Sequence, residues 1–495
     1  MTNEPGSLFE ALKIALAASG DRVILANESR ALRGSTLLDE VERWAEALAA
    51  LGVRAGDRVA VQAEKSLELV QLYLATLRLG AVYLPLNSAY QIAEIGYFLD
   101  DAQPVLFVCD PADAEAFVDC GVLVGTLSAN STGSLVETVA ARHHSAPAHG
   151  ARGEDLAAII YTSGTTGRSK GAMITHANLL SNARALISAW GIGPEDVLLH
   201  ALPLFHIHGL FVALNTLLLA GGTVRLLPGF DSDKVIDGLP GASLFMGVPT
   251  YYVRLLANAR LNLGAVAGVS LFVCGSAPLT IATFEAFEAR TGHRILERYG
   301  MSECGIICSN PLNGPRLAGA VGRPLDGIAA RIADGKDVGV LEVSGPNVFA
   351  GYWRQPEKTR AEFRDDGFFV TGDIATIDDD DVVRIVGRDK DMIIAGGLNV
   401  YPVEIEALID LLPGVDESAV IGLPHPDFGE VVAAVIRPLS GSTPDQTEII
   451  AALRPQLASF KLPKAVFVVT ELPRNTMGKV QKALLRAQYS NWFES

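Results

Sequence analysis

The 495-residue chain is long enough for roughly three domain-sized units, and its 49% apolar residues can bury several cores. A formal charge of −16 argues against a general nucleic-acid or anionic-membrane surface, so binding of a phosphate-rich ligand must depend on local cations. The five cysteines are odd in number and form no Cys-x-x-Cys pair, which predicts reduced thiols and no zinc site.

The first third of the chain predicts an α/β layer structure. The first residues lack the basic region and apolar core of a signal peptide, so we expect a cytoplasmic protein. Helical stretches at 38–51 and 67–79 alternate with short apolar strands at 59–61 and 105–108. Residues 110–155 are rich in Ala, Ser and Gly and give no clear elements.

The most informative segment is 161–171, which reads YTSGTTGRSKG. An apolar strand is expected before it at 157–160, and another resumes at Met173, so the segment is predicted to link two strands. Glycines let backbone N–H groups approach phosphate oxygens, while hydroxyls and Lys170 add donors and charge. We therefore predict a triphosphate-binding loop; a flexible Ser/Gly turn is the alternative. Because Gly167 and Lys170 are separated, it is not a Walker A loop.

The middle of the chain raises a membrane alternative. No formally charged side chain occurs between Asp196 and Arg225, a span of transmembrane length. Pro203, two histidines and several glycines interrupt it, which favours a loop followed by a buried helix at 210–219.

The composition changes twice in the last third. Between 319 and 387, short strand candidates such as 339–343 and 382–386 are separated by glycine and acidic turns, which predicts a small β-rich subdomain. After Lys390 an α+β segment is expected, with a helix at 404–411 and strands at 418–422 and 431–436.

Seven further motifs follow the glycine-rich loop in order: LPLFH at 202–206, GVPTY at 247–251, GSAP at 275–278, YGMSE at 299–303, TGD at 371–373, GR at 387–388 and PRNTMGK at 473–479. With that loop, they resemble the adenylate-forming superfamily of acyl-CoA synthetases over about residues 25–485. The resemblance implies a large ATP- and acyl-binding domain at 1–389 and a small mobile domain at 390–495, with Lys390 as the hinge. Two α/β layers and a β-rich subdomain would form the large domain.

The same resemblance implies a nucleotide site. Tyr299 would stack on adenine, Asp373 would accept from the ribose hydroxyls beside Arg388, and the nucleotide-contacting residues would be Thr162, Ser163, Gly164, Thr165, Thr166, Gly167, Lys170, Gly275, Ser276, Ala277, Pro278, Tyr299, Gly300, Met301, Ser302, Asp373 and Arg388. Glu303 would hold Mg²⁺ with help from Thr166. The family more often has threonine at Ser302, whose hydroxyl would lie near the α-phosphate.

For catalysis, the resemblance implies that Lys479 bridges the acyl carboxylate and the α-phosphate, and leaves when the small domain rotates for thioester formation. Gly396, Gly397 and Leu398 would then line the pantetheine tunnel for coenzyme A. The residues around Lys479 also resemble a context in which a lysine acetyltransferase switches such enzymes off.

The acyl pocket is where the chain departs from the general pattern. Amino-acid-activating relatives carry an aspartate at the position of His206, and relatives that take apolar acids place an uncharged residue at Arg298. A buried arginine requires an anion, so we expect a second substrate carboxylate there, with His206 and Ser276 as further donors. In this respect the chain resembles malonyl-CoA synthetases, which implies malonate as substrate and methylmalonate as a second one.

Several alternatives stay open from the residues. Arg298 could pair with Glu297 or with another acid and never contact the substrate, although the opposite orientation of strand neighbours weakens the Glu297 pairing. His206 and His208 could contribute to a metal site, which would need a third ligand. At the level of function, the chain could be a CoA ligase for another small, apolar or aryl acid, an acyl-AMP ligase that loads a carrier protein, or a non-catalytic nucleotide-binding scaffold.

Overall fold

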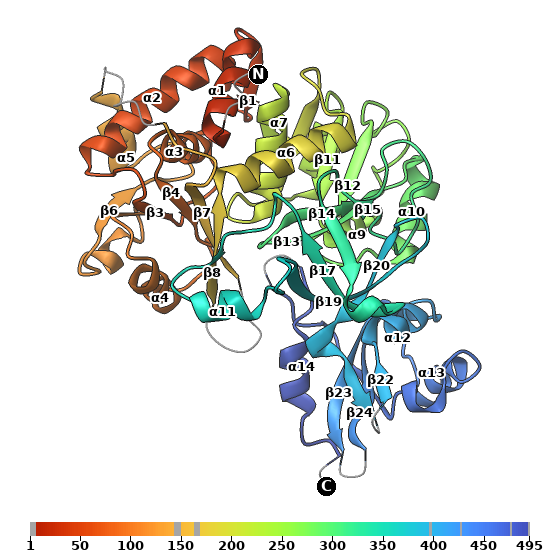
Figure 1. The fold of residues 1–495 in the computed structure, drawn as a ribbon. Coiled ribbons are helices and arrows are strands. Elements are labelled where there is room, and N and C mark those ends of the chain that lie inside the picture. The colour runs from red at the N-terminus through yellow and green to blue at the C-terminus, as the bar shows by residue number, and fades with distance from the viewer. Residues whose placement is uncertain are drawn as a thin grey trace.

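The computed structural model describes residues 6–142, 150–162, 169–395, 398–425, 428–475 and 478–493. Within these residues the chain forms four sheets. Figure 1 shows a large body of helices and sheets, with the small C-terminal domain, in blue, below it. The predicted fold class, a large α/β domain with a β-rich subdomain and a small α+β domain, is confirmed.

The central nine-stranded sheet has the order β15-β14-β13-β12-β11-β9-β10-β1-β2. Its strands are β1 (Val23–Ala26), β2 (Ala31–Arg33), β9 (Val197–His200), β10 (Thr223–Leu226), β11 (Leu244–Gly247), β12 (Leu271–Cys274), β13 (Leu296–Met301), β14 (Gly305–Ser309) and β15 (Arg323–Pro324). Six of them, from β1 to β13 in sheet order, pair in parallel. The carboxyl ends of β9, β11 and β12 therefore meet at one edge.

A second sheet of seven strands has the order β18-β8-β7-β4-β3-β5-β6. Its strands are β3 (Arg58–Val61), β4 (Val82–Pro85), β5 (Leu106–Cys109), β6 (Leu123–Thr126), β7 (Leu156–Thr162), β8 (Lys170–Thr175) and β18 (Gly351–Tyr352). β7 and β8 are antiparallel, with Thr162 opposite Lys170, so the glycine-rich loop does link two strands.

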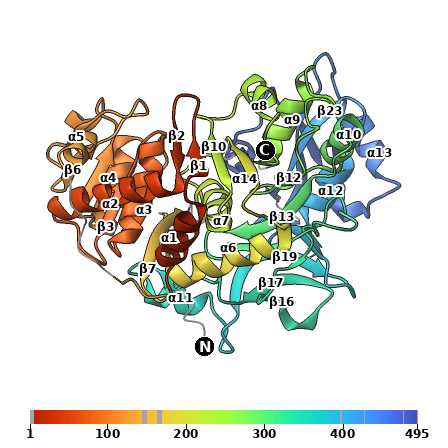
Figure 2. The same cartoon turned by 90° about the horizontal axis from the view of Figure 1, so that it is seen from above.

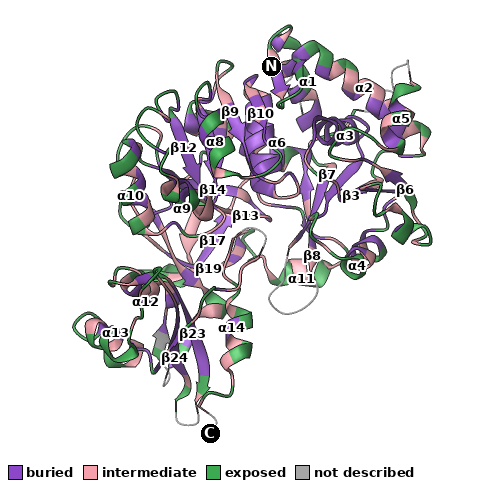
Figure 3. Cartoon of the chain, turned by 180° about the vertical axis from the view of Figure 1, so that it is seen from behind, coloured by how far each residue is buried: buried purple, intermediate pink, exposed green. Residues whose placement is uncertain are grey.

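Helices separate and cover the two large sheets: α1 (Leu8–Ser19), α2 (Gly34–Ala50), α3 (Leu67–Arg78), α4 (Ile92–Ala102), α5 (Ser134–Ala140), α6 (His176–Trp190), α7 (Asn215–Ala220), α8 (Ser232–Gly238), α9 (Pro249–Ala257) and α10 (Ile281–Thr291). Figure 2 shows α1, α6 and α7 between the sheets, and Figure 3 shows that the strands and the central helices are mostly buried. α6 begins with a reciprocal cap in which Thr175 and Asn178 each bond the other's backbone N–H.

The β-rich subdomain is an antiparallel sheet of β16 (Ala329–Ile332), β17 (Val338–Ser344), β19 (Phe369–Ile377) and β20 (Val383–Arg388). Helix α11 (Pro356–Ala361) follows β18. The small domain has strands β21 (Ile393–Ala395), β22 (Leu398–Val400), β23 (Val415–His425), β24 (Gly429–Pro438) and β25 (Ala465–Val468), with helices α12 (Pro402–Ile409), α13 (Gln446–Leu453) and α14 (Lys482–Tyr489).

The predicted helix at 210–219 differs in detail. It begins earlier, with a π-helical stretch at His208–Leu214, and continues as α7 to Ala220. Gly209 permits this start, because a Cβ there would lie 2.0 Å from the carbonyl oxygen of Pro203. No helix within the described residues is both long and apolar enough to cross a membrane.

All five cysteines are free, and four of them, Cys109, Cys274, Cys304 and Cys308, are buried. Burial raises the pKa of each of these four thiols. The structure has no disulfide among the described cysteines, and reduced thiols stay a prediction.

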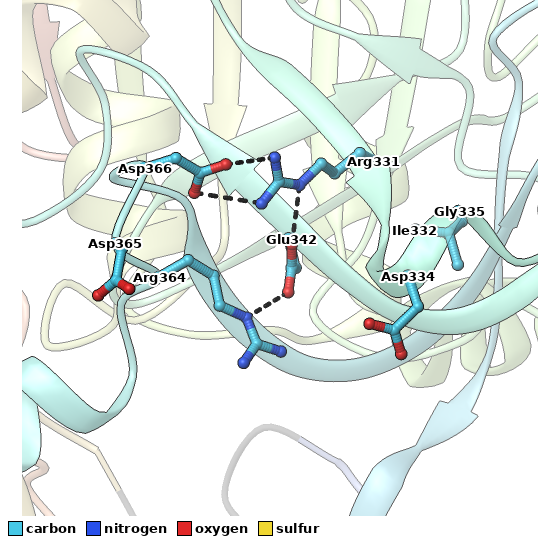
Figure 4. Close-up of a pocket in the computed structure, with 8 residues that line it drawn as sticks. All are labelled: Arg331, Ile332, Asp334, Gly335, Glu342, Arg364, Asp365 and Asp366. Atoms are coloured by element: carbon cyan, nitrogen blue, oxygen red, sulfur yellow. Dashed lines mark hydrogen bonds and ion pairs between the residues drawn. The ribbon is translucent and has the colours of Figure 1, made fainter.

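A charged groove of about 730 Å³ lies on the β-rich subdomain (Figure 4). At its base Glu342 is 3% exposed and accepts from the Nε atoms of Arg331 (2.8 Å) and Arg364 (2.5 Å). Arg331 also bonds both oxygens of Asp366. The network ties β16 and β17 to the turn before β19.

Replacing Glu342 with Gln should lower the melting temperature, because two guanidinium groups lose their shared carboxylate, at a cost of about 1.5–3 kcal/mol per charged hydrogen bond. Thermal unfolding measures the shift. Asp334→Asn is the control, since its ion pair with Lys336 lies at the same groove but is highly exposed. Equal shifts in both variants would contradict a structural role for Glu342.

Candidate active site

One cluster of predicted site residues lies where β13, β19 and β20 come together. Asp373 and Arg388 are cross-strand neighbours, and Arg388 Nε lies 2.9 Å from Asp373 Oδ1. Tyr299, on β13, donates its hydroxyl to the other oxygen of Asp373 at 2.6 Å. Asp373 is 3% exposed. Two long-range contacts thus fix one carboxylate, which is suited to accept from a polyhydroxylated ligand.

Lys479 reaches this cluster from the small domain. Asn475 fixes its turn by accepting the Lys479 backbone N–H at 2.9 Å. Burial, and then the nearby charge of Arg388, lower the pKa of Lys479 to about 8, while Asp373 opposes the shift. A lysine from the end of the chain therefore lies among the residues predicted to hold the ribose.

A close contact positions that turn against the large domain. Gly478 has a φ of 74°, and a Cβ there would lie 2.9 Å from Cγ2 of Thr250 at the start of α9. Glycine meets both demands, since it tolerates positive φ and leaves room for Thr250. Lys390 lies in the short helix Asp389–Asp391 between β20 and β21, the position expected of a hinge.

A second cluster surrounds the predicted triphosphate loop. Lys170 Nζ lies 3.4 Å from Glu362 Oε1 and 4.9 Å from the centre of the Tyr352 ring. The Tyr352 hydroxyl lies 3.1 Å from Glu303 Oε1 and 2.7 Å from Glu362 Oε2. The loop residues Ser163, Gly164, Thr165, Thr166 and Gly167 lie outside the described residues, as do Gly396 and Gly397.

The residues here fit a divalent cation that is bound together with phosphate. Glu303 and Glu362 share one hydroxyl proton, and burial raises the pKa of Glu303, so a cation would relieve the crowding of negative charge. No group of three or more His, Cys, Asp or Glu ligands occurs within the described ranges. An ion such as Mg²⁺ would accordingly take most of its ligands from phosphate and water.

The third cluster is built around Arg298. This residue is 3% exposed on β13, and no described residue forms a hydrogen bond with its buried Nε and Nη2 atoms. A Cβ at Gly275 would lie 2.6 Å from its Cζ, so the glycine leaves the space that the guanidinium group fills. Burial lowers the pKa of Arg298 only to about 10, which leaves it charged at neutral pH.

The pairing of Arg298 with Glu297 is not supported. Glu297 accepts the backbone N–H of Leu279 at 3.2 Å, and no ion pair within the described part of the chain involves Arg298. Burial raises the pKa of Glu297 to about 8. The two side chains lie on opposite faces of β13, as strand geometry predicts.

Histidines complete the cluster around Arg298. His206 Nδ1 accepts the backbone N–H of His208 at 3.1 Å, which leaves its ring proton on Nε2. Burial and the charge of Arg298 lower the pKa of His206 to about 4 and that of His208 well below its usual value, so both rings are neutral. Ser276, with a φ of 73°, places its hydroxyl 3.3 Å from His208 Nδ1. His206 bonds the His208 backbone, and the described residues supply no third metal ligand, so the metal alternative is not supported.

The remaining predicted residues that the structure describes lie on or between β12, β13 and β22. Gly300 is at a bulge, where a Cβ would lie 2.1 Å from the carbonyl oxygen of Gly305, and Met301 and Ser302 follow it half-buried. Ala277 and Pro278 are in the loop between β12 and α10. Leu398 is on β22 with half of its side chain exposed.

Sequence reasoning did not assign Tyr352, Glu362 or Thr250 to the site. Thr250 does lie within the GVPTY motif at 247–251, which was the available signal, and Tyr352 ends the sequence FAGY at 349–352. Glu362 follows α11 in a charged surface stretch, and nothing in its pattern distinguishes it from a solvent-facing acid.

Two large sheets, a β-rich subdomain and a C-terminal domain that brings Lys479 close to Asp373 and Arg388 are the arrangement that the sequence predicts for a nucleotide-using enzyme. Family models of AMP-binding enzymes match residues 12–353, and those of the AMP-binding enzyme C-terminal domain match 404–479. The chain belongs to the AMP-binding enzyme family.

Three relatives indicate its place there. A feruloyl-CoA synthase of Amycolatopsis is 35% identical over 93% of this chain and 94% of its own length. A malonate–CoA ligase of Arabidopsis thaliana is 33% identical over 99% of this chain and 90% of its own. ATP-bound MatB from Rhodopseudomonas palustris is 48% identical, with a TM-score of 0.96 over 99% of this chain and 100% of that one.

Replacing Gly478 with Ala should slow ATP–pyrophosphate exchange roughly 10- to 100-fold, because an added Cβ would push the Lys479 turn away from Thr250. Gly441→Ala is the matched control: its φ is 82°, but its Cβ would meet nothing within 4 Å. Comparable losses in the two variants would attribute the effect to backbone strain and contradict a docking role for Gly478.

Proposed function

We propose that this AMP-forming acid–CoA ligase activates malonate. It uses ATP, Mg²⁺ and coenzyme A, as the class does. The observation that carries the proposal is the buried charge of Arg298, two of whose nitrogen atoms lack a partner. A buried cation without a counter-ion is costly, so a substrate that brings its own anion would be favoured.

The geometry suits a short diacid. The distal carboxylate would bind the Arg298 guanidinium, and the neutral His206 could donate one hydrogen bond from Nε2 without adding charge. Ser276 and His208 form the adjoining wall. An apolar or aryl acid would leave the guanidinium group unpaired, which disfavours the alternative suggested by the feruloyl-CoA synthase relative.

In the first half-reaction, a carboxylate oxygen of malonate attacks the α-phosphorus of ATP, and pyrophosphate leaves. Lys479, placed beside Asp373 and Arg388, would offset the negative charge that builds up between carboxylate and phosphate. Mg²⁺ supplies further charge neutralisation at the phosphates, with Glu303 and the loop residue Thr166 as its proposed protein ligands.

In the second half-reaction, the thiolate of coenzyme A attacks the acyl carbon of malonyl-AMP, and AMP leaves. We propose that the small domain turns at Lys390 between the two steps, so that Lys479 withdraws and the segment of Gly396, Gly397 and Leu398 lines the thiol path. Acetylation of Lys479, a cytoplasmic location and methylmalonate as second substrate stay predictions.

Replacing Arg298 with Met should lower kcat/KM for malonate. The activation free energy should rise by about 1.5–3 kcal/mol, because a charge-assisted pair is lost. A CoA-thioester assay with malonate, methylmalonate, succinate, acetate and benzoate measures both wild-type preference and its change. Arg294→Met removes an exposed arginine nearby and serves as the control. Wild-type preference for benzoate or acetate, or normal malonate turnover in Arg298→Met, would overturn the proposal.

Replacing Lys479 with Ala should abolish malonyl-AMP formation but spare thioester formation from supplied malonyl-AMP, since only the first step needs its charge between two anions. The two half-reactions are measured separately, by pyrophosphate release and by thioester yield. Lys464→Ala, an exposed change in the same domain, should affect neither. Equal loss of both half-reactions would contradict this division of roles.

A further inference from the structure

A lysine from one large sheet contacts a histidine from the other, one hydrogen bond away from the cluster around Arg298. Lys65 Nζ lies 3.3 Å from His200 Nδ1 and 3.2 Å from the carbonyl oxygen of His200. Lys65 follows β3 of the seven-stranded sheet, while His200 is the last residue of β9 in the nine-stranded sheet. The contact therefore joins the two layers at the carboxyl end of β9.

The position of Lys65 is rigid. Ser66 caps α3 by accepting the backbone N–H of Leu69 at 3.0 Å, and every residue of α3 is buried. Lys65 is held in the short turn between β3 and this buried helix. Its side chain is only partly exposed, and burial lowers its pKa to about 7.

His200 links this lysine to the cluster around Arg298. Its Nε2 lies 2.9 Å from the carbonyl oxygen of Gly209, which can only accept, so the ring proton is on Nε2 and Nδ1 accepts from the Lys65 ammonium group. Gly209 follows His208 directly. Lys65, His200 and the Gly209 peptide thus form one chain of hydrogen bonds that ends beside the residues around Arg298.

Two basic side chains, Arg298 and Lys65, lie close enough to this chain of hydrogen bonds to act on its histidines. Arg298, His206 and His200 are all close enough to His208 to lower its pKa, and Lys65 lowers that of His200. Within the described residues, no ion pair involves Lys65; the exposed Glu64 is the one carboxylate whose charge acts on its pKa. Arg298 is thus charged and Lys65, with a pKa of about 7, is partly protonated at neutral pH. Glu297 acts on the pKa of Arg298 and Glu64 on that of Lys65, but within the described residues neither carboxylate forms an ion pair with either cation.

We propose that Lys65 is a specificity-determining positioning residue: through His200 it adds a second positive charge behind the acyl pocket, and so favours a dianionic acid over a monoanionic one of the same shape. The proposal rests on the malonate assignment and deepens it. Arg298 would bind the distal carboxylate directly, while Lys65 would strengthen the field along the wall without touching the substrate.

The test compares malonate with its monoamide, malonamate, which has the same size but one negative charge fewer. We expect the ratio of kcat/KM for malonate to that for malonamate to fall about tenfold in Lys65→Met, mainly through KM for malonate. The ratio should fall by the same amount in Lys65→Gln, because glutamine keeps a hydrogen-bond donor but carries no charge. Lys65→Arg should restore most of the ratio.

Lys13→Met is the control for net charge, since it removes one exposed positive charge from α1. Melting temperatures identify any variant that fails to fold, and Lys65→Gln and Lys65→Arg then decide the question. An unchanged ratio in Lys65→Gln, or equal losses with both substrates, would overturn the role of the Lys65 charge while the malonate assignment stands. A wild-type enzyme with no preference for malonate would overturn both.

Discussion

The proposed acyl site depends on one energetic cost of folding: a guanidinium group is enclosed by protein, and two of its nitrogens have no hydrogen-bond partner among the described residues. Everything around it is arranged to permit this. Gly275 gives it space, the imidazoles beside it stay neutral, and Glu297 on the same strand faces away. These features leave the guanidinium group without an ion pair among the described residues, so a substrate carboxylate could supply the hydrogen-bond acceptor that Arg298 lacks.

The nucleotide side is organised on the opposite principle, because its charges are already paired. Asp373 is held by Tyr299 and Arg388, and Lys170 lies beside Glu362. Binding of a triphosphate and its metal would have to replace some of these ion pairs and hydrogen bonds with contacts to the ligand. The two halves of the proposed site thus differ: Arg298 has no ion-pair partner among the described residues, whereas the charged groups on the nucleotide side are already paired with one another.

Much of this arrangement could be predicted from the sequence. Strand and helix periodicity gave the layers, and ordered motifs brought Lys479, Asp373 and Arg388 to one site by resemblance. The π-helical start at His208 was not predicted, because a buried apolar run has the same pattern in either helix type. The Lys65–His200 contact was not either, since its partners are 135 residues apart and belong to different sheets. The Thr250–Gly478 contact likewise depends on how two domains meet, which periodicity does not report.

The four buried cysteines are relevant to a side reaction of this chemistry. An enzyme that handles a free thiol and an activated acyl group could lose either to its own sulfur atoms, by mixed disulfide formation or by acyl transfer. Only the deprotonated sulfur reacts in these ways. Because burial keeps Cys109, Cys274, Cys304 and Cys308 protonated, these thiols compete poorly with coenzyme A for the activated acyl group.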